Sequence, residues 1–144
     1  MSGGFIAGVQ SPAVSFSANS AVTYAGLLLK KNATSGEIEL CANDERPDGY
    51  AVKSTENLAG TAVADVQVGM LPLITGNVVE MVLAADNAAI TIGENIESAD
   101  GGKVDGETAG TIHVGVALEA KDALDGAIAA KRFIKVLVNL QAHV

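Results

Sequence analysis

The feature that most constrains the fold of this chain is a series of short stretches in which apolar residues alternate with others. The clearest runs from Arg132 to Leu140, where Ile134, Val136 and Val138 fall on one side of an extended backbone. Because successive side chains of a strand point to opposite faces, this pattern predicts a strand with one buried face. Weaker signals of the same kind occur at residues 26–31, 37–40, 49–54, 90–97 and 111–119.

Turn signals separate these stretches. Residues 70–74 and 78–83 flank Thr75-Gly76-Asn77, which predicts a hairpin, and Pro72 favours an edge position for its first strand. Residues 120–130 contain helix-forming residues interrupted by an Asp-Gly pair, so they predict a loop or a short helix.

Composition limits the kind of core that these strands can build. The chain has 144 residues, of which 49% are hydrophobic but only 3% are aromatic, and it has no Trp. The core must therefore consist of Val, Ile, Leu and Ala, and the length suits one domain. We expect a mainly β protein, a small β-barrel or β-sandwich-like domain with short helical turns.

A faint internal similarity accompanies this pattern. Gly49-Tyr50-Ala51-Val52-Lys53 and Val114-Gly115-Val116-Ala117-Leu118 each follow an acidic turn. The two segments suggest a duplicated β unit, although the similarity is too weak to count as a sequence repeat.

The first charged residue is Lys30, and the segment before it is rich in Gly, Ser and Ala. We expect residues 1–25 to form an extended N-terminal arm and residues 26–144 to form the β-rich domain. On this view deletion of Met1 to Val22 leaves a folded domain, and plain terminal disorder is the alternative for the arm. Its apolar residues are the candidate partner-binding residues, because a purely solvating tail is more polar: Phe5, Ile6, Val9, Val14, Phe16, Val22 and Tyr24.

The charge balance argues against two classes of partner. The formal net charge is -8, from 9 Lys and Arg against 17 Asp and Glu. Such a surface repels phosphate backbones and anionic lipid heads, so we expect neither nucleic acid nor membrane partners. No stretch approaches the roughly 20 apolar residues of a membrane span. The single cysteine, Cys41, is expected to be a buried thiol.

The search for chemistry finds no convincing set of functional groups. His113 lies within a predicted strand without a nucleophile elbow elsewhere in the chain, and His143 lies at the frayed end. The carboxylates of residues 44, 45 and 48 are those of a solvated turn, and Glu37 and Glu39 share one face of an exposed strand. We therefore expect no catalytic, cofactor-binding or metal-binding residues, and a protein that is not an enzyme.

Several segments resemble one broad family, the head-decoration or capsid-cement proteins of tailed viruses. Its members are short, Ala/Gly/Val-rich and aromatic-poor β proteins with a flexible N-terminal arm. The resemblance extends from about Gly26 to Leu140, and the segment between Thr55 and Leu83 is longer than expected. The segments that carry it are Gly49-Tyr50-Ala51-Val52, Ala88 to Glu94, Asp100 to Val104, Val114 to Leu118 and Lys135 to Val138.

The resemblance implies a virion structural protein, made in the host cytoplasm and located on the outer capsid surface. It implies a homotrimer at local threefold positions, with the N-terminal arm contacting the major capsid protein. Two alternatives remain. One is another self-assembling β protein of a tail, fibre or bacterial compartment; the other is a small-ligand-binding β-barrel or an unrecognised hydrolase, which requires a cavity with convergent polar groups.

Overall fold

The computed structural model describes residues 3–55, 66–107 and 112–142, and within them the chain is mainly β, as predicted. The short helical turns are two 3-10 turns, η1 (Asp100–Gly102) and η2 (Asp125–Ala127). The strands are β1 (Gly4–Ala7), β2 (Val14–Ser17), β3 (Leu28–Lys31), β4 (Ile38–Leu40), β5 (Gly49–Ala51), β6 (Gln67–Pro72), β7 (Val78–Val82), β8 (Asn95–Ser98), β9 (Val104–Gly106), β10 (Ile112–Ala117) and β11 (Phe133–Ala142).

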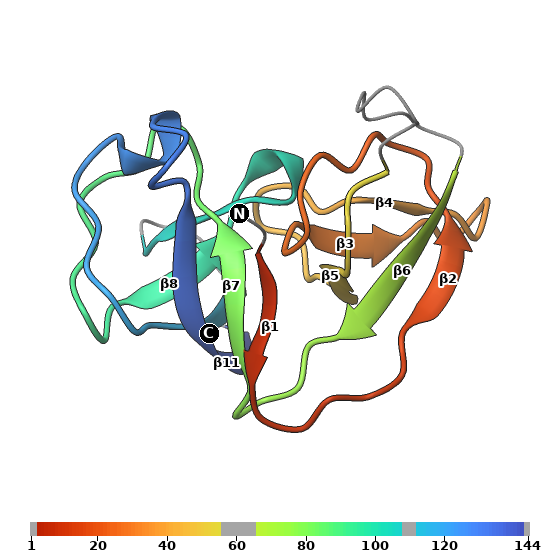
Figure 1. Cartoon of the computed structure of the whole chain (residues 1–144), viewed down its shortest axis with the longest axis horizontal. Coiled ribbons are helices and arrows are strands. Elements are labelled where there is room, and N and C mark those ends of the chain that lie inside the picture. Colours follow the sequence, from red (N-terminus) through yellow and green to blue (C-terminus); the bar gives the residue numbers. More distant parts are fainter. Residues whose placement is uncertain (1–2, 56–65, 108–111, 143–144) are drawn as a thin grey trace.

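The strands form two antiparallel sheets that lie side by side (Figure 1). One sheet has the order β1-β7-β11-β10-β8-β9, and the other has the order β2-β6-β5-β3-β4. The predicted strand at 132–140 is β11, and Ile134, Val136 and Val138 on its inner face are fully buried. Alternation in the sequence therefore identified a central strand of the larger sheet.

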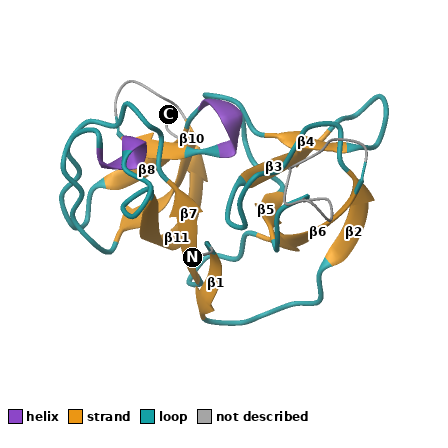
Figure 2. Ribbon diagram, turned by 45° about the horizontal axis from the view of Figure 1, so that its top comes forward, coloured by secondary structure: helices purple, strands orange, loops and turns teal. Residues whose placement is uncertain are grey.

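The predicted hairpin around Thr75-Gly76-Asn77 is wrong, because β6 and β7 belong to different sheets. β6 lies between β2 and β5, so Pro72 is not on an edge strand; it ends β6, opposite Gly49. The connection carries the chain from one sheet to the other (Figure 2). Gly76 in this connection has a positive φ of 98°, as expected of a turn. The Asn77 side chain that follows it does not close a hairpin but binds the backbone of Val9.

The two sheets are built on the same plan. We call β2 to β6 unit 1 and β7 to β11 unit 2. In unit 1, β3 and β4 form a hairpin, β5 pairs with β3, β6 pairs with β5, and β2 pairs with β6. In unit 2, β8 and β9 form the equivalent hairpin, β10 pairs with β8, β11 pairs with β10, and β7 pairs with β11. The first to fifth strands of each unit are thus paired in the same way. β1 is the one described strand outside this plan, and it pairs with β7.

The register agrees residue by residue. Gly49 of β5 lies opposite Leu29 and Pro72, and Gly115 of β10 lies opposite Ile96 and Val138. At both glycines an added Cβ would meet a backbone carbonyl of the fifth strand, at 2.3 Å in unit 1 and 2.2 Å in unit 2. The faint similarity between segments 49–53 and 114–118 therefore marks equivalent strands of a duplicated unit.

Each unit also curls so that its outer strands meet. A parallel bridge joins Ala18, just after β2, to Ile38 of β4, and the equivalent bridge joins Leu83, just after β7, to Val104 of β9. The Asn19 N–H donates to the Ile38 carbonyl at 2.6 Å in unit 1, and the Ala84 N–H donates to the Val104 carbonyl at 2.8 Å in unit 2. Both units are therefore strongly curved rather than flat.

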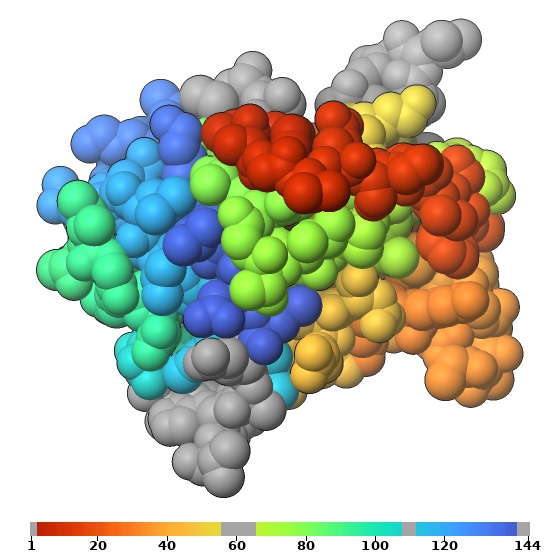
Figure 3. Space-filling view, turned by 90° about the horizontal axis from the view of Figure 1, so that it is seen from below, coloured from red at the N-terminus to blue at the C-terminus, as the bar shows by residue number. Residues whose placement is uncertain are grey.

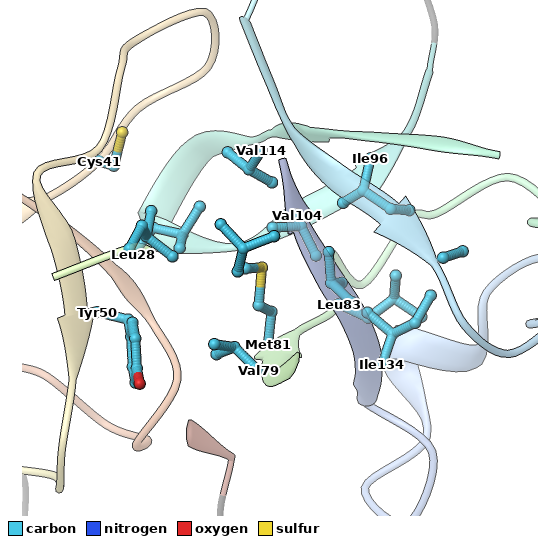
Figure 4. Packing of buried hydrophobic residues seen from close by; sticks show 14 of the residues in the cluster. Leu28, Cys41, Tyr50, Val79, Met81, Leu83, Ile96, Val104, Val114 and Ile134 are labelled. Carbon is cyan, nitrogen blue, oxygen red and sulfur yellow. The ribbon is translucent and has the colours of Figure 1, made fainter. Parts of the chain in front are cut away.

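The buried side chains form two clusters. One fills the interior of unit 1 and includes Val82 and Phe133 of unit 2, and the larger cluster fills unit 2 and extends to the outer side of unit 1. In Figure 4, Leu28 and Tyr50 of unit 1 lie on the side of this cluster opposite Ile96 and Ile134 of unit 2. Aliphatic residues predominate in this shared core, with Cys41, Met81 and one Tyr, as expected for an aromatic-poor chain.

Candidate functional site: the N-terminal arm and the surface around it

The N-terminal segment supplies a strand to each sheet. β1 pairs with the outer edge of β7, with Phe5 opposite Val79, and β2 pairs with β6, with Phe16 opposite Val68. Figure 3 shows the segment lying across one face of the molecule from unit 2 to unit 1. The described part of the segment is thus hydrogen-bonded to both sheets.

A buried amide holds the arm between these two strands. The Val9 N–H donates to Asn77 Oδ1 at 2.8 Å, and Asn77 Nδ2 donates to the Val9 carbonyl at 2.6 Å. Gly8 precedes this contact with a φ of 118°, and a Cβ there would lie 2.2 Å from Asn77 Oδ1. The Asn77 side-chain amide therefore makes the two hydrogen bonds to Val9 that the backbone of a neighbouring strand would make. Only glycine fits beside this amide at position 8.

The seven candidate partner-binding residues of the arm divide into two groups. Ile6 is 45% exposed, Val9 69% and Val14 56%. Val22 is fully buried, while Phe5, Phe16 and Tyr24 are half-buried and pack against the two clusters. The exposed group can meet a partner without rearrangement of the chain, whereas Val22 is part of the core of unit 1.

Tyr24 is held from two sides. Its ring packs edge-on against Phe133 with the centroids 5.7 Å apart, and the Arg132 guanidinium lies 5.1 Å from its ring centroid. Arg132 also donates a hydrogen bond to the Tyr24 hydroxyl. The side chain thus joins the end of the arm to the start of β11.

The acidic turn at residues 44–48 does not gather its carboxylates. Glu45 accepts a hydrogen bond from Lys30, which lowers the pKa of the carboxyl and raises the pKa of the ammonium. Asp48 accepts the Lys31 N–H at 2.7 Å, and Asp44 is exposed on a left-handed backbone with a φ of 58°. Glu39 Oε1 lies 3.5 Å from Lys30 Nζ. Glu39, Glu45 and Asp48 therefore each contact a neighbouring strand residue and do not form a shared carboxylate site.

A cavity of about 300 Å³ lies where η1 and the start of β9 meet the segment after β7. Its polar lining comes from Asn43, Asp86, Asp100, Lys103 and Asp105. Burial raises the pKa of the Asp105 carboxyl, and Asp86 and Glu97 raise it further, against a hydrogen bond from the Gly106 N–H. Among the described residues, no three His, Cys, Asp or Glu side chains are placed to hold a metal ion.

The remaining chemistry-bearing residues lie apart from this cavity's lining. Cys41 is fully buried, burial raises the pKa of its thiol to about 12, and its Sγ donates to the Glu45 carbonyl at 3.2 Å. His113 lies opposite Glu97 in the sheet, with its Nε2 3.4 Å from the Glu107 carboxylate. His143 lies outside the described residues. In the described part of the chain, no helix has the length and apolar character needed to cross a membrane.

Comparison with known proteins finds a similar fold among solved structures. No protein-family model matches the chain, and no curated protein matches it. Among solved structures, it is similar to the crystal structure of the head fiber gp8.5 N base in bacteriophage phi29, with a TM-score of 0.63 and 19% sequence identity. The match covers 94% of this chain and 98% of that chain. The two proteins therefore share a fold along nearly their whole matched lengths.

Proposed function

We propose that this chain is a structural protein of a tailed-phage head, bound to the outer capsid surface as a decoration protein or fibre base. The observation that carries the proposal is the shared fold with the phi29 head fiber base, which covers 94% of this chain. The sequence segments that resemble capsid-cement proteins support the same role independently, because that resemblance rests on residues and not on the fold.

The arm supplies the capsid contact in this proposal. Ile6 and Val9 are exposed apolar residues close together in the arm, and the arm lies across one face of the molecule (Figure 3). Contacts of this size are weak one at a time, but a trimer that presents three such arms to a symmetric lattice gains affinity through effective concentration. Three copies and a site on the local threefold axes follow from the resemblance to cement proteins.

The test is binding to expanded, undecorated capsids of the phage that encodes the chain. We expect saturable binding at a fixed ratio to the major capsid protein, measured by sedimentation of the capsids and quantitation of the bound chain. The Val9→Asp variant is expected to bind at least about ten-fold more weakly, because a carboxylate cannot be buried without a partner.

The matched control is Leu124→Asp, which adds the same charge at an exposed apolar residue far along the chain from the arm. It should bind like the wild type. A chain that ignores capsids at every concentration contradicts the proposal. Equal binding by the two variants contradicts the role of the arm alone.

A further inference from the structure

The duplication of the unit allows surfaces of unit 1 and unit 2 to be compared position by position. Within one chain the units meet at a junction. Leu28, Tyr50 and Leu71 on the outer side of unit 1 belong to the same buried cluster as Val79 and Met81 of unit 2 (Figure 4). The junction therefore uses one face of unit 1 and a different face of unit 2.

Two close backbone approaches define this junction further. A Cβ on Gly26 of unit 1 would lie 2.3 Å from the Glu80 carbonyl of unit 2. A Cβ on Gly102 of unit 2 would lie 2.7 Å from the Leu28 carbonyl of unit 1, and the Gly102 N–H donates to the Cys41 carbonyl at 2.7 Å. Both glycines also have a positive φ. Glycine is therefore favoured at each position for two reasons, the lack of space for a Cβ and the left-handed backbone.

The face that unit 2 uses in the junction is open in unit 1. Register makes Val14 the equivalent of Val79, yet Val14 is 56% exposed and Val79 is fully buried. Gly36 is the equivalent of Gly102 and has nearly the same φ, but a Cβ there would meet nothing within 4 Å. No hydrogen bond among the described residues covers the outer edge of β2 before Ala18, whereas β1 covers that edge of β7.

The face that unit 1 uses is open in unit 2. Gly26 and Gly93 each donate to the carbonyl of the equivalent alanine, Ala51 or Ala117, which makes Ile92 the equivalent of Ala25. Ile92 is 70% exposed and Ala25 is 5% exposed. A Cβ on Gly93 would meet nothing within 4 Å.

The residues in the middle of this face are also buried in unit 1 and more exposed in unit 2. Val116 is the equivalent of Tyr50 and Leu137 is the equivalent of Leu71. Tyr50 and Leu71 are buried at the junction, whereas Val116 and Leu137 are only half-buried and belong to neither core cluster. Unit 2 thus shows a mainly apolar face, with the half-buried Asn95 in the place of Leu28, whose counterpart in unit 1 is covered.

From these pairs we infer that two copies of this chain associate head to tail, with the open face of unit 2 in one copy covering the open face of unit 1 in the next. The contact repeats the junction between the units of a single chain, so the known junction supplies its geometry. In Figure 3 the segment around residue 92 and the segment around β2 lie toward opposite ends of the molecule. Such a contact uses two different faces and produces a closed ring or an open chain of copies.

The prediction concerns the purified chain without any capsid, so it stands or falls separately from capsid binding. The mass is measured by light scattering after size exclusion, over a range of concentrations. The wild type should exceed the mass of one chain, and the Val14→Asp and Ile92→Asp variants should each associate about 100-fold more weakly, since each places a carboxylate in an apolar contact. Both residues are highly exposed, so neither change should unfold the chain.

Mixing the two variants separates this inference from a two-fold symmetric contact. Each variant keeps one intact face, so an equimolar mixture should form a dimer of one chain of each kind and go no further. The control is Leu118→Asp, because Leu118 and its equivalent Val52 are exposed alike, at 41% and 42%, and lie outside the repeated contact. A monomeric wild type, variants with the wild-type mass, or a mixture that stays monomeric would overturn the inference.

Discussion

Asp105 lies on β9 and lines the cavity between η1 and the segment after β7. The carboxylates of Asp86 and Glu97 lie near it. Burial is the main reason that its pKa is raised, and the two neighbouring acids act in the same direction. The fold therefore favours the protonated carboxyl. The stability that this group contributes is complete below the usual pKa of an aspartate and is lost as the pH rises through the raised pKa of the folded state.

The first prediction follows from that sign. The Asp105→Asn variant should have a higher free energy of unfolding than the wild type at pH 7, because Asn keeps an acceptor for the Gly106 N–H and has no charge. The difference should shrink toward zero at about pH 3, where an aspartate is largely protonated in both states. Urea unfolding at the two pH values measures it.

The control for this prediction is Asp122→Asn at an exposed position in the loop before η2. It should change stability by less than about 0.5 kcal/mol at both pH values. If Asp105→Asn gives the same difference at pH 7 and at pH 3, the raised pKa is not the cause.

At the scale of elements, the arm decides how the two sheets are completed. β1 closes one edge of the larger sheet and β2 completes the five-strand plan of unit 1. Ala18 and Val22, which follow β2, are fully buried. The division of the chain at residue 26 stays a prediction about independent folding, but these contacts lead to a different expectation for deletion of the arm.

The second prediction compares two deletions. Removal of residues 1–9 takes away β1 and the contact with Asn77, and it should leave a folded but less stable chain. Removal of residues 1–22 also takes β2 and two buried side chains, and it should abolish the cooperative thermal transition in circular dichroism, because the lost burial alone is worth several kcal/mol. A stable, cooperative chain lacking residues 1–22 would instead agree with an arm that is separate from the domain.

At the scale of the whole molecule, two units of one plan share a core. The larger cluster contains Leu28, Cys41, Tyr50, Leu71 and Leu73 from unit 1 or its ends together with residues of every strand of unit 2. Separation of the units exposes those side chains to water. Neither unit therefore has a complete core when the other is unfolded.

The third prediction is that the wild type unfolds in one transition despite its duplication. Calorimetric and van't Hoff enthalpies should agree, and denaturation curves followed by Tyr fluorescence and by circular dichroism should coincide. The two tyrosines, Tyr24 and Tyr50, both report on unit 1 and its junction. Two resolved transitions would show that the shared cluster does not couple the units. The measurement is made at low protein concentration so that association between copies does not contribute.

Local sequence indicated most of the strands, with β1, β2 and β9 as exceptions, and little of their pairing. Alternation of small aliphatic residues predicted a mainly β chain, identified β11 by its buried side, and marked β5 and β10 as similar segments. These are properties of neighbouring residues, so they are visible without tertiary structure. The same reasoning named the apolar residues of the arm, and three of those seven are exposed on its surface.

Tertiary structure decided what local pattern could not. Asn77 looked like a hairpin residue because Gly-Asn sequences favour turns, but its amide binds the backbone of Val9, 68 residues away. Ile92 gave no signal of its own, and the sequence did not separate the exposed Val14 from the buried Val22, because exposure depends on what packs against a residue and not on its identity. In the sequence the duplicated plan showed only in that one pair of similar segments, since β-strand pairing fixes backbone hydrogen bonds and burial while leaving most side chains free to change.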